Sequence, residues 1–224
     1  PSLFIRVLRY YFPHPAKVGP SVRRRVVLPS LLLSPFLNLI PGVSTGQVPP
    51  ADVQVAAAVL AGPTTQRDGA AVLGYDSSGQ VVSLREGSNG LICLSDDPVA
   101  DGFSVACYHK SLEPYMARGR ELASQGMTDG QQRLQTRWKE ADEGSLAMPE
   151  DPASLYVLTG SSYDATTGEV VDSYLRYVVY IPWATIESTG LPDAPMGPGS
   201  PWLMYPGTAG AHVMISPPRT GPGR

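Results

Sequence analysis

Two cysteines, Cys93 and Cys107, are the only ones in the chain, and three chemistries suit such a pair. They can form a disulfide, hold a metal ion as two thiolates, or include one reactive thiol. The thirteen-residue gap between them matches no zinc-ligand spacing and there is no second cysteine pair, so the pattern favours a disulfide. We expect this bond to pin the intervening loop against a helix that starts at Ser111, and to stabilise the fold by about 3 kcal/mol.

His109 and His212 are the two histidines that follow residue 46, and both suit acid–base or metal chemistry. Glu113 lies one helical turn beyond His109 and could join the imidazoles as a base or a ligand. If the segments of the two histidines pair in a sheet, the three side chains would form a site of two imidazoles and one carboxylate, of the kind that binds zinc or iron. No H-E-x-x-H or H-x-H spacing supports this site, so two structural histidines are the favoured alternative.

Three aspartates between the cysteines, Asp96, Asp97 and Asp101, offer the oxygen ligands that a hard cation such as calcium prefers. The stretch lacks the alternating aspartates and the distal glutamate of an EF-hand loop, so a solvated acidic loop is favoured over a metal site. The sequence also contains no P-loop, dinucleotide-binding fingerprint or haem-attachment motif. We therefore expect no cofactor.

Residues 42–46 match G-x-S-x-G, the nucleophile elbow of α/β hydrolases, whose serine sits on a sharp turn between a strand and a helix. Here the pattern follows an apolar run and precedes Pro49-Pro50, so the strand and helix that it requires are missing. A catalytic role for Ser44 is not expected.

The elements that position these residues are indicated by caps, turns and periodicity. Good helix formers run from Ala51 to Ala61, and a turn cluster at 76–79 between two β-rich runs predicts a hairpin. Two amphipathic helices follow, one capped by Ser111 and the other by Asp129. Strand signals lie at 70–75, 80–85, 154–160, 173–183 and 211–216. Because helices and strands do not alternate, we predict a single α+β domain with a mainly antiparallel sheet, two or three helices and one disulfide.

A proline recurs at every third position from Pro192 to Pro201. Three residues make one turn of a polyproline II helix, so the prolines would line one edge of it, as they do in proline-rich ligands. The favoured alternative is an ordered surface loop, because proline restricts the backbone of such loops.

Charge divides the chain near residue 46. All 20 Asp and Glu lie after this point and six of the 17 Lys and Arg lie before it, so the downstream part carries −9 against −3 for the whole chain. The basic run 23–25, the apolar run 26–40 and the small residues 42–46 have the layout of a secretory signal peptide. We expect a leader and signal peptide at 1–46, a globular domain at 47–216 and a flexible tail at 217–224. A retained membrane anchor is the alternative, but the run is shorter than the ~20 apolar residues of a spanning helix.

The stretches LREGSNGLICLSDDP, ACYHKSLEPYMARGREL, STGLP and PWLMYPGTAGAHVMI lie at 84–98, 106–122, 188–192 and 201–215. Together they resemble a group of exported proteins of environmental bacteria that carry no assigned function. The resemblance spans most of the expected mature chain. It implies export and a single domain, and it implies no catalytic residues.

Two functions remain open. The first is a non-catalytic exported domain, periplasmic or extracellular, that binds a small molecule or a protein, with aromatic residues of the second half lining a pocket or filling the core. The alternative is a small hydrolase or metal-dependent enzyme that uses His109, His212 and Glu113. Net negative charge disfavours nucleic acid and acidic membranes as partners, and no stable membrane anchor is expected after processing.

Overall fold

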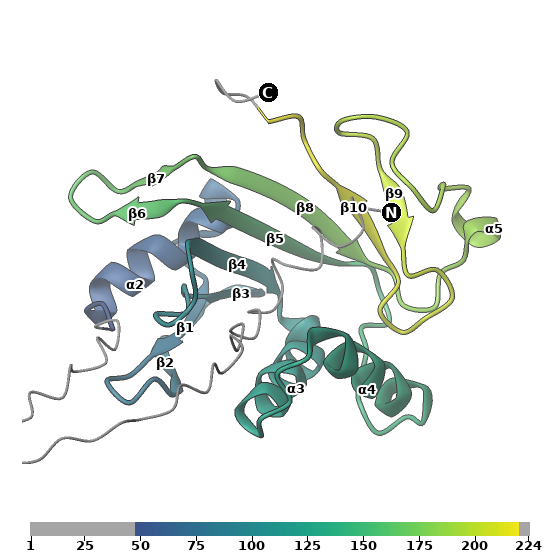
Figure 1. Cartoon of the computed structure of the whole chain (residues 1–224), viewed down its shortest axis with the longest axis horizontal. Helices are drawn as coiled ribbons and strands as arrows, with labels where there is room; N and C mark the ends of the chain where they lie inside the picture. Colours follow the sequence, from purple (N-terminus) through teal and green to yellow (C-terminus); the bar gives the residue numbers. More distant parts are fainter. Residues whose placement is uncertain (1–47, 220–224) are drawn as a thin grey trace, which may run out of the picture.

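An eight-stranded sheet runs through residues 48–219, the part of the chain that the computed structural model describes (Figure 1). Its strand order is β2-β1-β3-β4-β5-β8-β10-β9. The strands are β1 (Ala71–Tyr75), β2 (Val81–Arg85), β3 (Leu91–Leu94), β4 (Phe103–His109), β5 (Ala153–Gly160), β8 (Tyr174–Tyr180), β9 (Trp202–Met204) and β10 (His212–Ile215). A separate hairpin of β6 (Ser162–Asp164) and β7 (Glu169–Val171) lies between β5 and β8 in sequence.

Neighbouring strands are antiparallel with one exception, the parallel pair of β1 and β3. The predicted hairpin accounts for this exception. Strand β2 returns the chain to the end of the sheet where β1 begins, and β3 starts from that end on the other side of β1. The domain is thus α+β with a mainly antiparallel sheet, as the sequence predicts.

One face of the sheet is covered at the β1–β3–β4 end by helix α2 (Ala51–Ala58), which continues as a 3-10 turn, η1 (Val59–Ala61). Small residues such as Ala58 and Ala61 let this helix lie close to the strands. Buried Gln54 also joins the helix to β1, since its side-chain amide bonds both the backbone N–H and the carbonyl of Tyr75, at 2.8 and 2.9 Å.

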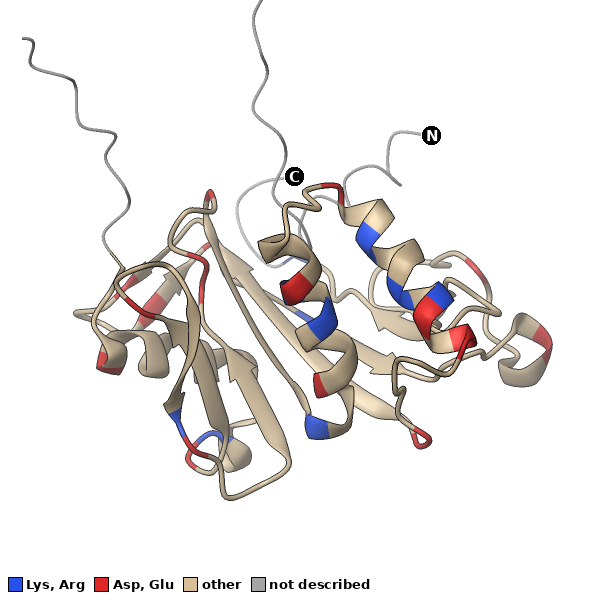
Figure 2. Ribbon diagram, turned by 90° about the horizontal axis from the view of Figure 1, so that it is seen from below, with Lys and Arg blue, Asp and Glu red and all other residues tan. Residues whose placement is uncertain are grey.

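Helices α3 (Glu113–Ser124) and α4 (Gly130–Asp142) pack together on the opposite face (Figure 1). Seen from below, both carry interspersed basic and acidic residues (Figure 2). Arg118 on α3 bonds the carboxylate of Glu140 on α4 at 2.6 and 2.9 Å, which holds the pair together. Asp129 caps α4 as predicted, because its side chain accepts from the backbone N–H groups of Gln131 and Gln132.

The start of α3 differs from the prediction. His109 rather than Ser111 caps the segment, because its Nδ1 accepts from the backbone N–H of Ser111 at 3.3 Å. A 3-10 turn, η3 (Lys110–Leu112), comes first, and α3 itself begins at Glu113 with Pro114 in its first turn. The hydroxyl of Ser111 is hydrogen-bonded to Nδ1 of the His109 ring, 2.8 Å away, so it does not cap the helix.

The proline-containing segment forms an ordered loop. A short helix, α5 (Ile186–Thr189), precedes it, and the carbonyl of Pro192 accepts a 2.8 Å bond from Leu203 in β9. Gly199 donates to the carbonyl of Ser216 at 2.8 Å, so the loop is held at two points.

Contacts continue into the expected tail, where the guanidinium of Arg219 lies over the ring of Tyr174. The expected leader and signal peptide, with Ser44, lie outside the described residues. Within residues 48–219 no helix is long and apolar enough to span a membrane.

Candidate functional site

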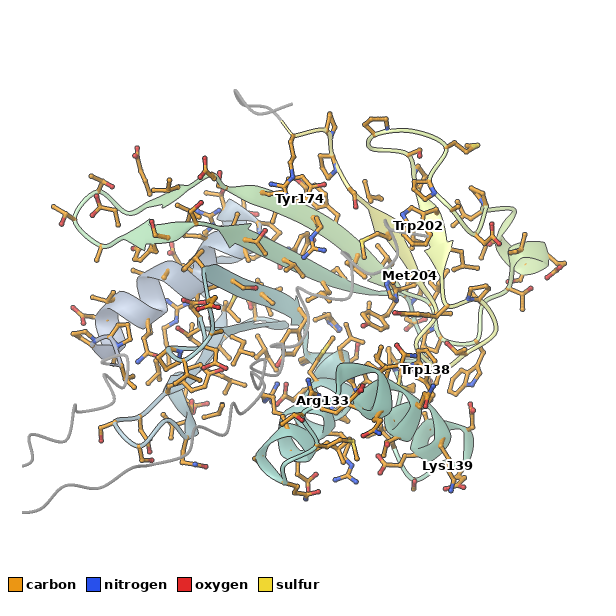
Figure 3. The ribbon with its side chains drawn as sticks, in the orientation of Figure 1. Arg133, Trp138, Lys139, Tyr174, Trp202 and Met204 are labelled. Carbon is orange, nitrogen blue, oxygen red and sulfur yellow. A yellow bond between two sulfur atoms is a disulfide. The ribbon has the colours of Figure 1, made fainter. Side chains whose placement is uncertain are left out.

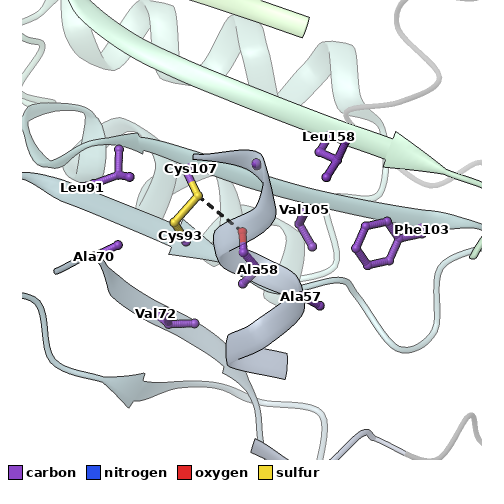
Figure 4. Packing of buried hydrophobic residues seen from close by; sticks show 11 residues of the cluster. Ala57, Ala58, Ala70, Val72, Leu91, Cys93, Phe103, Val105, Cys107 and Leu158 are labelled. Atoms are coloured by element: carbon purple, nitrogen blue, oxygen red, sulfur yellow. Dashed lines mark hydrogen bonds between the residues drawn. A yellow bond between two sulfur atoms is a disulfide. The ribbon is translucent and has the colours of Figure 1, made fainter. Parts of the chain in front are cut away.

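The disulfide between Cys93 and Cys107 is present, and it lies inside the core (Figure 4). The two residues are directly opposite each other on β3 and β4, with Cα atoms 4.0 Å apart. Both are fully buried, and the Sγ atom of Cys107 is 3.4 Å from the carbonyl oxygen of Ala58 on α2. The bond therefore faces α2, on the side of the sheet away from α3. The expectation that it pins a loop against the helix after Ser111 is wrong, because residues 93 and 107 point to the opposite face.

The two histidines are not brought together. Strands β5 and β8 lie between His109 on β4 and His212 on β10, which puts the backbones about 14 Å apart at the usual strand spacing. His109 is exposed at the end of its strand, whereas His212 is buried between aromatic rings. Glu113 bonds neither of them. The three side chains thus do not form the site of two imidazoles and one carboxylate that was considered from the sequence.

His212 is a structural residue in this arrangement. Its Nδ1 lies 2.8 Å from the carbonyl oxygen of Gly210, so Nδ1 carries the hydrogen and donates it. Burial lowers the pKa of His212 to about 4, and the bond to Gly210 offsets only part of that shift. The ring is therefore neutral at physiological pH.

Glu113 instead belongs to a polar cluster between α3 and the sheet. Its Oε2 accepts a 2.5 Å hydrogen bond from the phenol of Tyr108, a residue of β4 that is only 2% exposed. Arg120, two turns along α3, donates to Glu113 Oε1 at 2.5 Å and to the Tyr108 oxygen at 3.1 Å. Burial is the main reason that the pKa of the Tyr108 phenol lies well above its usual range. The phenol therefore remains a hydrogen-bond donor.

Two aspartates and a second tyrosine complete this cluster. Burial raises the pKa of Tyr75, the charges of Asp97 and Asp96 add to the rise, and the charge of Arg120 opposes it. The charges of Asp96, Asp97 and Arg120 thus all act on the Tyr75 phenol. Asp96 accepts a 2.8 Å bond from the backbone N–H of Ser104, yet burial raises its pKa to about 6, with a contribution from Asp97. We call this set the Arg120 cluster: Tyr75, Asp96, Asp97, Tyr108, Glu113 and Arg120.

The strands beside the cluster present apolar side chains that are incompletely covered. Val72 and Cys93 point to the α2 face and are buried, so Leu73 and Leu94, their neighbours on β1 and β3, point to the same face as the cluster. Both leucines are only partly buried. Polar groups with perturbed pKa values beside partly exposed apolar side chains are typical of ligand sites.

The cluster combines hydrogen-bond donors with hydrogen-bond acceptors. Arg120 and the two phenols donate hydrogen bonds, and the carboxylates of Asp96, Asp97 and Glu113 accept them. Three carboxylates against one guanidinium leave the cluster with an excess of negative charge at neutral pH. Across residues 48–219 no three His, Cys, Asp or Glu side chains gather in a way that could hold a metal ion. Asp101, the third candidate calcium ligand, is exposed and does not belong to the cluster.

The sequence pattern indicated three members of the cluster, Glu113, Asp96 and Asp97, but not their grouping. It missed Arg120, whose seven-residue spacing from Glu113 on one helix was the available signal, since such residues share a helix face. Tyr75 and Tyr108 had no local signal, because the register of β1, β3 and β4 brings them to the same face.

Comparison of the chain with models of protein families, with curated proteins and with solved structures finds no match.

Proposed function

We propose that this chain is an exported, non-catalytic binding domain and that the Arg120 cluster binds its ligand. The observation that carries the proposal is the set of buried or half-buried charges and phenols beside partly exposed Leu73 and Leu94. A carboxyl group such as Asp96 loses hydration at such a position, and natural proteins accept that loss where a ligand replaces the water. The internal disulfide is compatible with folding in an oxidising compartment, and the leader-like segment supports export.

The chemistry of the cluster favours a ligand with a positively charged head and a short apolar stem. Within residues 48–219 no cationic side chain forms a salt bridge with Asp96 or Asp97, whereas Glu113 is paired with Arg120 at 2.5 Å. An ammonium group would fill the place of that missing cation, and its stem would cover the two leucines. Binding would strengthen as pH rises through about 6, because Asp96 then loses its proton.

Calorimetric titration with n-hexylammonium tests this proposal, with hexanol and hexanoate as probes that share the stem. At pH 8 we expect hexylammonium to bind, hexanol to bind about tenfold more weakly or not at all, and hexanoate to be excluded by the carboxylates. Asp96→Asn should weaken hexylammonium binding and remove the pH dependence near 6. Asp101→Asn is the matched control, because Asp101 is an exposed aspartate of the same loop.

Equal affinity for the three probes, or unchanged binding in Asp96→Asn, would contradict recognition by charge. If none of the three probes binds, the support for a ligand site at this cluster is removed.

A further inference from the structure

The turn that follows β8 carries a bulky residue where a small one is expected. Ala184 donates its backbone N–H to the carbonyl of Ile181 at 3.1 Å, which closes a turn with Pro182 and Trp183 at its centre. Trp183 has a φ of 59°. The position after proline in such a turn is normally Gly or Asn when φ is positive, because other side chains crowd the backbone.

Core packing does not explain why a tryptophan occupies this position. Its side chain is 46% exposed. Its indole Nε1 donates a 2.8 Å hydrogen bond to Oδ1 of Asp142, the exposed last residue of α4. Residues with strained backbone conformations cluster at active sites, ligand clamps and switch regions.

A second turn fixes the first one in place. The backbone N–H of Trp183 donates to the carbonyl of Thr208 at 2.8 Å, and that of Gly207 donates to the carbonyl of Ala184 at 2.7 Å. Tyr205, which begins the second turn, also has a positive φ, of 57°.

Both strained aromatic residues lie against α4. The ring of Tyr205 packs edge-on against Trp138, with centroids 5.0 Å apart, and Trp183 bonds Asp142 one helical turn later. Figure 3 shows Trp138 between α4 and the end of the sheet that carries Met204. The helix and the two turns therefore hold the Trp183 ring in a fixed orientation toward solvent.

We propose that Trp183 and Asp142 form a carbohydrate subsite that takes one pyranose ring of a neutral saccharide. The apolar C–H face of a pyranose can stack on the electron-rich face of an exposed indole. A carboxylate at the edge of the indole can accept a hydrogen bond from a sugar hydroxyl, because each of its oxygens has more than one lone pair. This subsite is separate from the Arg120 cluster and does not depend on the function proposed there.

The geometry favours a sugar over the other ligands of tryptophan. A quaternary ammonium is bound by several aromatic faces around it, whereas Trp183 is the exposed ring here and its neighbours Trp138 and Tyr205 are half-buried. Asp142 and Glu143 disfavour an anionic ligand. A half-exposed ring with a carboxylate at its edge suits a hydroxyl-bearing ligand, which can stack its C–H face on the indole and donate a hydrogen bond to the carboxylate.

Titration calorimetry of the full chain with cellohexaose and chitohexaose tests the subsite, with tetramethylammonium as the competing probe. We expect the wild type to bind at least one of the two sugars and not tetramethylammonium. Trp183→Gly should weaken sugar binding about tenfold or more, while its melting temperature stays the same or rises because glycine relieves the positive φ. Trp183→Phe keeps a ring face and should bind the sugar better than Trp183→Gly does.

The opposite pattern would overturn the proposal. If neither sugar binds the wild type, or if Trp183→Gly binds as the wild type does, the ring is not a subsite. If Trp183→Gly melts at a lower temperature and Trp183→Phe restores the melting temperature without any sugar binding, the tryptophan is a packing residue. Preference for tetramethylammonium would assign the ring to a cation instead.

Discussion

The phenol of Tyr108 donates a 2.5 Å hydrogen bond to the carboxylate of Glu113, and this bond joins the central part of the sheet to the first turn of α3. Arg120 bonds both partners, so the sheet residue, the helix start and the middle of the helix form one network. Because these groups are charged or hydrogen-bonded and partly shielded from water, their contributions are coupled. The network therefore fixes the position of α3 over β4, which the Arg120 cluster requires.

The disulfide should contribute substantially to stability without touching either proposed site. Reduction, or the double change Cys93→Ala with Cys107→Ala, should lower the free energy of unfolding by about 3 kcal/mol, because the bond closes a loop with a sequence separation of 14. Urea denaturation of the oxidised and reduced chain measures the difference. Equal midpoints would mean that the packing around Ala58 alone maintains this core.

His212 should make the protein sensitive to acid. Its pKa is about 4 in the folded protein and near 6.5 when unfolded, so the unfolded chain binds the proton more readily between these values. The folded state should lose about 3 kcal/mol as pH falls from 6.5 to 4. His212→Asn keeps a donor for the carbonyl of Gly210 and cannot titrate, so its stability should change less over that range. Parallel urea titrations of wild type and variant at pH 7 and pH 4.5 measure the effect, and an identical pH dependence would contradict it.

Asp96 should make the folded protein less stable as pH rises, which is the opposite of the effect of His212. Its folded pKa of about 6 lies above the ordinary value of 3.8, so the folded protein holds this proton more tightly and loses stability as pH rises between the two values. Asp96→Asn keeps an acceptor for Ser104 and should stabilise the protein at pH 8 by on the order of 1 kcal/mol, since solvent reduces the cost for a half-exposed carboxyl. The gain should vanish at pH 4. A variant that is less stable than wild type at pH 8 would show that the charge supports the fold.

Gly210 should tolerate no side chain. A Cβ atom at this position would lie 2.2 Å from Nε1 of Trp138, so Gly210→Ala must displace the indole from Tyr205 and Tyr115. We expect a loss of about 2 kcal/mol in the free energy of unfolding. Gly197→Ala is the control, because nothing lies within 4 Å of the added carbon, and thermal melting compares the two. An equal melting temperature for both variants would mean that the Trp138 packing is adaptable.

Local signals in the sequence predicted most elements of the fold. The turn cluster at 76–79 places the β1–β2 hairpin, and Asp129 marks the start of α4, because turn and cap residues act on backbone groups only a few positions away. The cysteine pair indicated its own disulfide. The hairpin, the cap and the disulfide are all confirmed.

Features set by tertiary contacts could not be predicted from the sequence. Strand β9 is three residues long and is completed by bonds to Pro192 and β10, so it has no periodicity of its own. The separation of His109 from His212 depends on the order of four strands, which no local pattern encodes. Glu113 was a candidate because it lies one helical turn beyond His109 in the sequence. The register of β4 brings Tyr108 to it instead, and the phenol of Tyr108 donates to its carboxylate.

The central claim, that the Arg120 cluster binds a cationic ligand, is tested most directly by two-dimensional 1H–15N NMR spectra recorded during a titration with n-hexylammonium at pH 8. We predict that the largest shifts fall on the amides of Asp97, Ser104 and Arg120, with smaller shifts at Leu73 and Leu94, and that Asp96→Asn removes them. Saturable shifts centred elsewhere in the domain, with those five amides unchanged, would contradict it.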